Sequence, residues 1–149
     1  GNTLPTSTVF TLGSGGDPNG NGANIIAYCF KSIKGYSKFG QYTGNNNTDG
    51  TFVYTGFKPA LVIVKRSDGS NAWCMYDNKR DDINPVHNAL MANRTDQEAD
   101  MGDGVDFLAT GIKVRDTGGE LNASGSTYFY MMFAEEPSVS SNGVPATAR

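Results

Sequence analysis

The stretch FKPALVIVKRSDGSNAWCMYDNKR, from Phe57 to Arg80, decides the fold class because it has the pattern of a β-hairpin. Ala60 to Val64 is a short apolar run rich in β-branched residues, long enough for a buried strand and too short for a helix. The polar cluster from Ser67 to Asn71 is typical of a turn. Ala72 to Asp77 then predicts a returning strand that carries Trp73, the single tryptophan of the chain.

Further strand-like runs lie on both sides of this hairpin. They are Asn24 to Ile33, Lys38 to Thr43, Phe52 to Tyr54, Val105 to Leu108, Gly111 to Arg115 and Thr127 to Glu135. Gly, Asn, Ser and Thr separate the runs, as is typical of an all-β protein with many short strands. The first and last runs are the most apolar, so we expect Ile25 to Lys31 and Thr127 to Glu135 to lie deep in one sheet.

The region from residue 81 to residue 104 lacks this periodicity. Only one short helix is expected there, from Ala92 to Met101, with Asn93 or Thr95 as its N-cap. The whole pattern predicts a two-sheet antiparallel β-sandwich of the jelly-roll or lectin-like kind, with at most one short helix.

The composition indicates one domain and excludes several functional classes. The expected organisation is a Gly/Asn-rich segment over 1–24, the sandwich over 25–136 and a polar tail over 137–149. A net charge of -3 without a basic cluster argues against nucleic acid. No apolar run is long enough for a membrane helix. The chain begins at Gly1 without Met, so we expect a processed product, a fragment or a partial chain.

Two cysteines, Cys29 and Cys74, lie inside apolar strand-like runs. This placement favours buried free thiols over a disulfide, although the sequence leaves open whether the two residues meet. There is no CxxC motif and only one histidine, His87, so no zinc site is indicated. We expect no cofactor.

The central hairpin also contains a candidate binding surface. Trp73 and Tyr76 supply aromatic rings, and Asn71 and Asp77 supply polar groups, which together are suited to stacking and hydrogen bonding with a carbohydrate. The other interpretation is that every second aromatic side chain of the strand faces the core. For Trp73 this interpretation is the favoured one. A ligand site is therefore a hypothesis about these four residues.

Acidic residues gather in the polar region after the hairpin. Two of Asp96, Asp100, Asp103 and Asp106 would be enough for glycoside hydrolysis, and the last three could ligate a cation. Acids in polar loops are more often simply solvated. No catalytic constellation stands out, so the sequence predicts a protein that is not an enzyme and holds no metal.

Several stretches, in their order along the chain, carry a resemblance to a known kind of domain. They are Leu4–Ser7, Ile26–Phe30, Gly35–Gly44, Phe52–Pro59, Val64–Asp68, Trp73–Arg80, Val105–Leu108, Asn122–Tyr128, Phe133–Pro137 and Ser141–Pro145. Together they resemble a domain found in tail-fibre and other virion structural proteins of tailed bacteriophages, notably phages of aquatic bacteria. No single stretch is a chemical motif, and an upstream fibre shaft has no counterpart in this chain.

The resemblance implies a virion or extracellular location and a structural role without catalytic residues. It implies self-association as a trimer or filament, contacts with other virion proteins, and a role in adhesion to a host-surface glycan. The alternative left open is a carbohydrate-binding module of a secreted or surface protein. Neither reading involves nucleic acid or a membrane.

Overall fold

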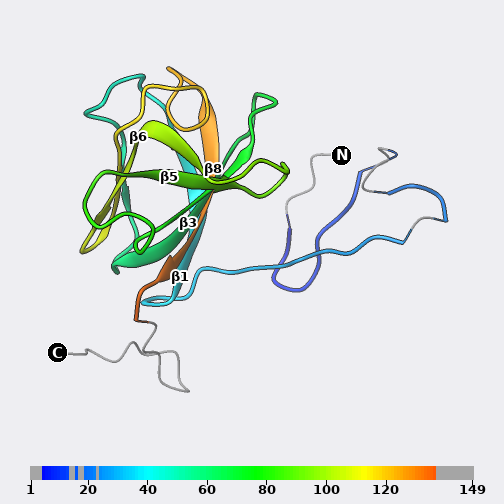
Figure 1. The fold of residues 1–149 in the computed structure, drawn as a ribbon. Helices are drawn as coiled ribbons and strands as arrows, with labels where there is room; N and C mark the ends of the chain where they lie inside the picture. Colours follow the sequence, from blue (N-terminus) through cyan, green and yellow to red (C-terminus); the bar gives the residue numbers. More distant parts are fainter. Residues whose placement is uncertain (1–4, 14–15, 17–18, 23, 137–149) are drawn as a thin grey trace. The chain divides into compact units, whose positions relative to one another are not determined.

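The structure, a computed structural model, describes residues 5–13, 16, 19–22 and 24–136 of the chain. The chain divides into two compact units, Gly1–Phe30 and Lys31–Arg149, and each is described by itself. All strands of the described residues belong to the second unit (Figure 1). Nowhere in the described ranges is there a helix long and apolar enough to cross a membrane.

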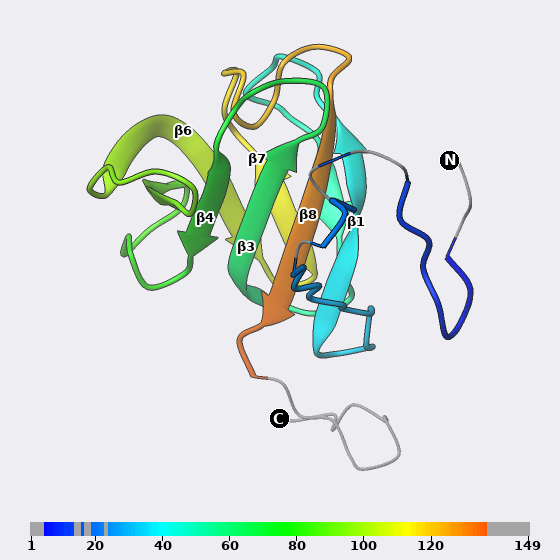
Figure 2. The same ribbon diagram turned by 90° about the vertical axis from the view of Figure 1, so that its right-hand side faces the viewer.

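The second unit contains eight described strands that form one antiparallel sheet. They are β1 (Ser37–Thr43), β2 (Phe52–Tyr54), β3 (Pro59–Arg66), β4 (Trp73–Asp77), β5 (Val86–Met91), β6 (Ala99–Leu108), β7 (Gly111–Val114) and β8 (Thr127–Ala134). The strand order is β1-β8-β3-β4-β5-β6-β7-β2, and Figure 2 shows β4, β3, β8 and β1 side by side.

The sheet curls until its two ends approach each other, which gives this unit a nearly closed, barrel-like form (Figures 1 and 2). The hydroxyl of Thr51, just before β2, donates a hydrogen bond of 2.7 Å to the carbonyl oxygen of Thr43 at the end of β1. The predicted all-β antiparallel class is confirmed. A sandwich of two separate sheets is not confirmed, because the pairing of β4 with β5 joins both halves into one sheet.

The predicted central hairpin is present as β3 and β4. Its register places Val62 opposite Tyr76, Val64 opposite Cys74 and Lys65 opposite Trp73. Residues alternate between the two faces of a strand, so Val62 and Val64 point into the interior while Lys65 lies on the outer face. The alternation in β4 buries Cys74 and Tyr76 and exposes Trp73.

The core fills the inside of the curled sheet. Its fully buried members come from both halves of the sheet and include Val62, Val64, Cys74, Tyr76, Val105, Ile112, Val114, Leu121, Tyr128 and Met132. Tyr42 and Tyr128 stack in this interior with ring centroids 5.1 Å apart. The Tyr42 hydroxyl donates to the carbonyl oxygen of Leu121 at 2.7 Å, which anchors the loop before β8 to β1.

Two predictions for the region from 81 to 104 are wrong. Ala92 to Met101 forms no helix: β5 ends at Met91, a loop follows, and β6 begins at Ala99. The sequence pattern missed β5 because the register with β6 shifts between Val86 and Asn88, which interrupts the period of two. Gly102, with φ +78°, interrupts the pattern of β6 in the same way.

The predicted strand from Asn24 to Ile33 is also absent, and Ile25 to Lys31 lies in no sheet. Among the described residues, the ladder contact of this run is an isolated bridge between Ile33 and Ser37. An apolar, β-branched run becomes a strand only where another strand offers hydrogen-bonding groups, and no described strand pairs with it. The run is exposed from Asn24 to Phe30.

Both cysteines are free thiols. Cys74 is buried as expected, and its burial raises its pKa to about 12, so the thiol stays protonated and unreactive. Cys29 is exposed, so the expectation of a buried thiol is wrong there. The reason is that the run around Cys29 is not part of the sheet.

Candidate functional site

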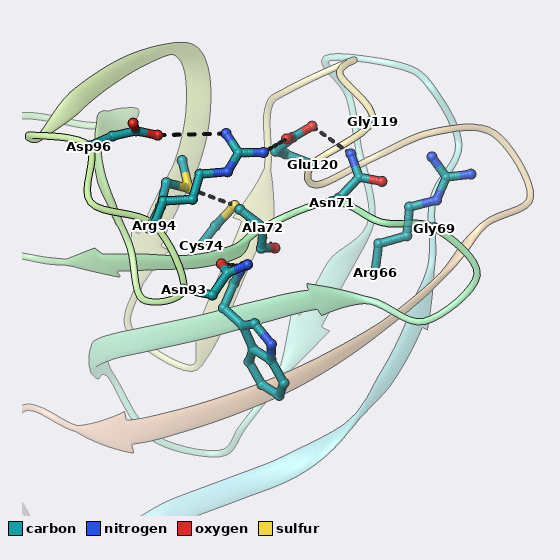
Figure 3. A network of polar contacts seen from close by, with 12 residues as sticks. Arg66, Gly69, Asn71, Ala72, Cys74, Asn93, Arg94, Asp96, Gly119 and Glu120 are labelled. Carbon is teal, nitrogen blue, oxygen red and sulfur yellow. Dashed lines mark hydrogen bonds and ion pairs between the residues drawn. The ribbon is translucent and has the colours of Figure 1, made fainter. Parts of the chain in front are cut away.

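The candidate site lies where three loops gather beside the β3–β4 hairpin (Figure 3). They are the hairpin turn, the loop between β5 and β6, and the loop between β7 and β8. The second loop is held against β4 by two hydrogen bonds. The Trp73 backbone N–H donates to Asn93 Oδ1 at 2.9 Å, and the Ala92 N–H donates to the Trp73 carbonyl oxygen at 3.0 Å.

A polar network links the three loops, as Figure 3 shows. Asn71 Nδ2 in the hairpin turn donates to Glu120 Oε2 at 2.7 Å. Arg94 lies between two carboxylates, with Nη2 3.8 Å from Glu120 Oε1 and Nη1 3.9 Å from Asp96 Oδ2. We call Asn71, Arg94 and Glu120 the polar rim. It places a guanidinium, a carboxylate and a carboxamide next to one another.

Arg66, at the end of β3, adds a second guanidinium to this side of the hairpin. Its Nε donates to Asp68 Oδ1 at 2.7 Å, and this hydrogen bond lowers the pKa of the Asp68 carboxyl. Lys65 Nζ caps the turn by donating to the carbonyl oxygens of Arg66 and Gly69 at 2.8 and 3.1 Å. A Cβ on Gly69 would lie 2.7 Å from Asn71 Oδ1 and 3.0 Å from Arg66 Cδ, so the turn packs closely against both side chains.

Trp73 stands on the outer face of the sheet with 39% of its surface exposed. The strand registers place Phe129 opposite Lys65 and Lys65 opposite Trp73, so the three side chains form one cross-strand row. Beside this row is an open hollow of ≈ 450 Å³, whose lining includes Ile63 and Met131. The indole therefore has apolar neighbours on the sheet and an open space next to it.

The structure does not bring the four residues proposed from the sequence onto one surface. Asn71 lies in the hairpin turn before β4, and Trp73 is the first residue of β4, with the buried Ala72 between them. Tyr76 points into the core and is fully buried, so it cannot share a surface with Trp73. Asp77 lies at the far end of β4, where Arg80 Nη2 is 2.9 Å from its Oδ2.

The sequence did not single out Arg66, Arg94 or Glu120. Each is one charged residue in a polar stretch, and no spacing or motif distinguishes it from its neighbours. Only the order of the strands in the sheet brings the loops that carry them together.

The acidic candidates do not form one cluster. Asp106 pairs with Arg115 Nε at 2.6 Å, and Asp100 Oδ1 accepts a hydrogen bond from the Gly102 N–H at 2.8 Å. Asp96 lies near Arg94, and the side chain of Asp103 lies outside the described part of the structure. Within that part, no three His, Cys, Asp or Glu side chains gather closely enough to hold a metal ion.

The fold and site define an all-β protein built on a curled antiparallel sheet, with a network of polar side chains beside the hairpin turn. The chain belongs to the family described as domain of unknown function (DUF7483), whose model matches residues 1–137. No curated protein and no solved structure matches the chain.

Proposed function

We propose that this chain is a non-enzymatic structural module of a virion or similar extracellular particle and assembles there with copies of itself. The ordered series of stretches that resembles tail-fibre and virion structural domains supports this context. The proposed assembly is a trimer or a filament in contact with other virion proteins. The curled sheet supplies a stable body for such a module, and the first unit supplies the contact.

One observation carries the proposal: an exposed apolar run in the first unit. Ile25, Ile26 and Tyr28 are 47%, 78% and 81% exposed. Several large apolar side chains exposed in succession are typical of an interaction surface. Full burial of one such side chain contributes about 1.5–3 kcal/mol, so covering three of them stabilises an assembly substantially.

A second copy of the chain is the proposed occupant of this run. The sequence from Asn24 to Ile33 has the composition of a strand but pairs with no described strand, so a neighbouring copy can supply the strand partner that its composition favours. Each added copy offers the same run again. Repetition of one contact produces a closed ring if the rotation closes and a filament if it does not.

The experiment measures the assembly state of the full chain by light scattering, with electron microscopy of the same sample. We expect a trimer or a filament. Changing Ile26 and Tyr28 together to Asp should shift the population to monomer, because a charge would be buried in the contact. Ile83→Asp is the matched control, since Ile83 is 75% exposed but lies in another loop.

A wild-type chain that stays monomeric at high concentration would contradict the proposal. So would an oligomer that the double substitution leaves intact, because the run would then be outside the contact.

A further inference from the structure

The side of the sheet that faces away from the core is rich in apolar residues over β1, β8, β3 and β4, the four strands that lie side by side in Figure 2. Successive side chains of a strand point to opposite faces, so every second residue lies on this outer side. An antiparallel sheet with one face in water normally carries polar residues there. Many of the outer positions are instead apolar. We call six of them the apolar face, namely Phe39, Ile63, Trp73, Met75, Phe129 and Met131.

Four members of the apolar face form one row across the strands. The registers place Phe39 opposite Met131, Met131 opposite Ile63, and Ile63 opposite Met75. Directly opposite side chains on one face of a sheet have Cβ atoms about 4.5–5.5 Å apart. The row is therefore a continuous apolar strip from β1 to β4.

A second row lies next to the first and contains Phe129, Lys65 and Trp73. Phe129 is 52% exposed, and both it and Trp73 line the open hollow of ≈ 450 Å³. The Lys65 ammonium donates to two carbonyl oxygens of the hairpin turn, so its charge is held at the turn and not over the apolar side chains. Contiguous apolar surface of this kind marks an interaction site.

The composition of the apolar face indicates a protein as the partner. Three of its six members are aromatic and two are methionines. Aromatic residues and Met are enriched at the centres of protein interfaces, charged residues are depleted there, and homodimer interfaces are the more apolar ones. The face therefore fits a lasting contact between copies of one chain.

The exposed run of the first unit has the matching chemistry. No Asp, Glu, Lys or Arg occurs from Asn24 to Phe30, so the face could cover this run without burying a charge. In an extended chain, Ile26 and Tyr28 lie on one side and about 7 Å apart, because the rise is 3.2–3.4 Å per residue. Phe129 and Met131, two residues apart on β8, have the same spacing.

The area of such a contact suits a repeated assembly. Ile25, Ile26 and Tyr28 are largely exposed, and covering them would bury roughly 800–1,000 Å² counted over both copies, close to the lower limit of a specific interface. A single contact of this size is weak. Closing a ring strengthens it, since the last contact then forms within one assembly.

We propose that the apolar face of one copy binds the exposed run of the next copy. This inference rests on the self-assembly proposed above and identifies the surface that receives the run. The run and the face are different surfaces, so each copy supplies one run and receives another. Such a head-to-tail contact produces a ring or a filament, depending on whether the rotation closes.

The experiment mixes two variants that should each be monomeric in analytical ultracentrifugation. The run variant, Ile26→Asp with Tyr28→Asp, keeps its apolar face, and the face variant, Phe129→Asp, keeps its run. Their mixture should form a dimer and nothing larger, because only the intact run of the face variant can bind the intact face of the run variant. Tyr54→Asp is the matched control and should assemble as the wild type does, since Tyr54 is 64% exposed on β2, at the other end of the strand order.

Trp73 provides a second measurement that requires no substitution in the apolar face. It is the only tryptophan of the chain, so its emission reports on this face directly. When a neighbour's run covers the indole, the emission should move to shorter wavelength as the wild type assembles. The run variant should keep the longer wavelength at the same concentration. This readout tests the inference even if Phe129→Asp fails to fold, which circular dichroism checks.

The outcomes separate this inference from the proposed function. A wild-type chain that stays monomeric contradicts self-assembly, and the inference falls with it. If the run variant is monomeric while Phe129→Asp assembles as the wild type does, or if assembly leaves the emission of Trp73 unchanged, self-assembly stands and the run binds another surface. A mixture of the two variants that stays monomeric also overturns the inference, because the contact would then lie within one chain or between two runs.

Discussion

Tyr76 is the most informative position for testing the packing of the core. Its side chain is fully buried, and its hydroxyl has no hydrogen-bond partner in the described structure. The ring packs closely on the opposite side of the interior, where a Cβ on Gly104 would lie 3.0 Å from Tyr76 Cε1. Burial raises the pKa of the hydroxyl far above its usual value, so the group is a neutral, desolvated donor at every accessible pH.

Replacing Tyr76 with Phe should stabilise the protein. A buried polar group without a partner costs about 1–3 kcal/mol, and Phe removes that cost while the ring keeps its contacts. We expect the free energy of unfolding to rise by about 1–2 kcal/mol. For a domain of this size, such a gain raises Tm by roughly 3–6 °C.

The matched comparison is Tyr42→Phe, at an equally aromatic and buried position. The Tyr42 hydroxyl donates to the Leu121 carbonyl oxygen at 2.7 Å, so its removal leaves that oxygen without its partner. Here the free energy of unfolding should fall by about 1 kcal/mol. Urea unfolding followed by Trp73 fluorescence and by circular dichroism measures both variants, because the two signals must agree for a two-state transition.

The two substitutions should change the free energy of unfolding in opposite directions: Tyr76→Phe should raise it and Tyr42→Phe should lower it. If Tyr76→Phe destabilises the protein or leaves its stability unchanged, then a partner such as a buried water satisfies the hydroxyl. The claim that the Tyr76 hydroxyl is buried without a hydrogen-bond partner would then be wrong.

Three further predictions concern stability. Asn122→Ala should cost about 3 kcal/mol in a urea titration, because the buried amide makes hydrogen bonds to two loop segments, one at Asn45 and Asn47 and the other at Asp116. Gly104→Ala should cost about 2–3 kcal/mol, since a Cβ would lie 2.0 Å from the Val86 carbonyl oxygen; a melt equal to wild type would contradict this close approach. Hydrogen bonding to Lys58, at 2.5 Å, lowers the pKa of Glu135 to about 2, so its contribution is complete above about pH 4.5 and disappears as the pH falls towards 2. Glu135→Gln should therefore cost about 1 kcal/mol at pH 7 and nothing at pH 2, measured by urea unfolding at both values.

The strands that the sequence predicted correctly are those whose signals are local. The hairpin of β3 and β4 has two apolar runs and a turn within 24 residues, from Phe57 to Arg80. Phe52–Tyr54 and Thr127–Ala134 likewise alternate or remain apolar between loops rich in small polar residues. Period-two patterns are reliable where no bulge interrupts them.

The strands and exposures that the sequence predicted wrongly depend on partners. β5 carries polar side chains outward and meets β6 with a shifted register, so its alternation is hidden. The run from Asn24 to Ile33 shows the opposite error: its composition predicts a strand, but no described strand pairs with it. A local pattern describes what a segment favours, whereas pairing depends on what the rest of the fold supplies.

The residues of the candidate site also fall into two groups: those that a local sequence pattern identifies and those that only the fold brings together. Asn71 and Trp73 could be chosen from the sequence because they belong to one hairpin. Glu120 lies 49 residues from its partner Asn71, and their hydrogen bond exists only because the sheet order brings the two loops together. Arg94 reaches the rim through the loop after β5, the strand that the sequence pattern missed.

The exposure of Trp73 itself could have been predicted from the charges of the hairpin. Trp73 shares a face with Asp77, and its neighbour on β3 is Lys65. A shift of one residue would bury Asp77, and burying a carboxylate costs far more than the unpartnered hydroxyl of Tyr76 does. The strand therefore exposes Trp73 whether or not the indole binds anything.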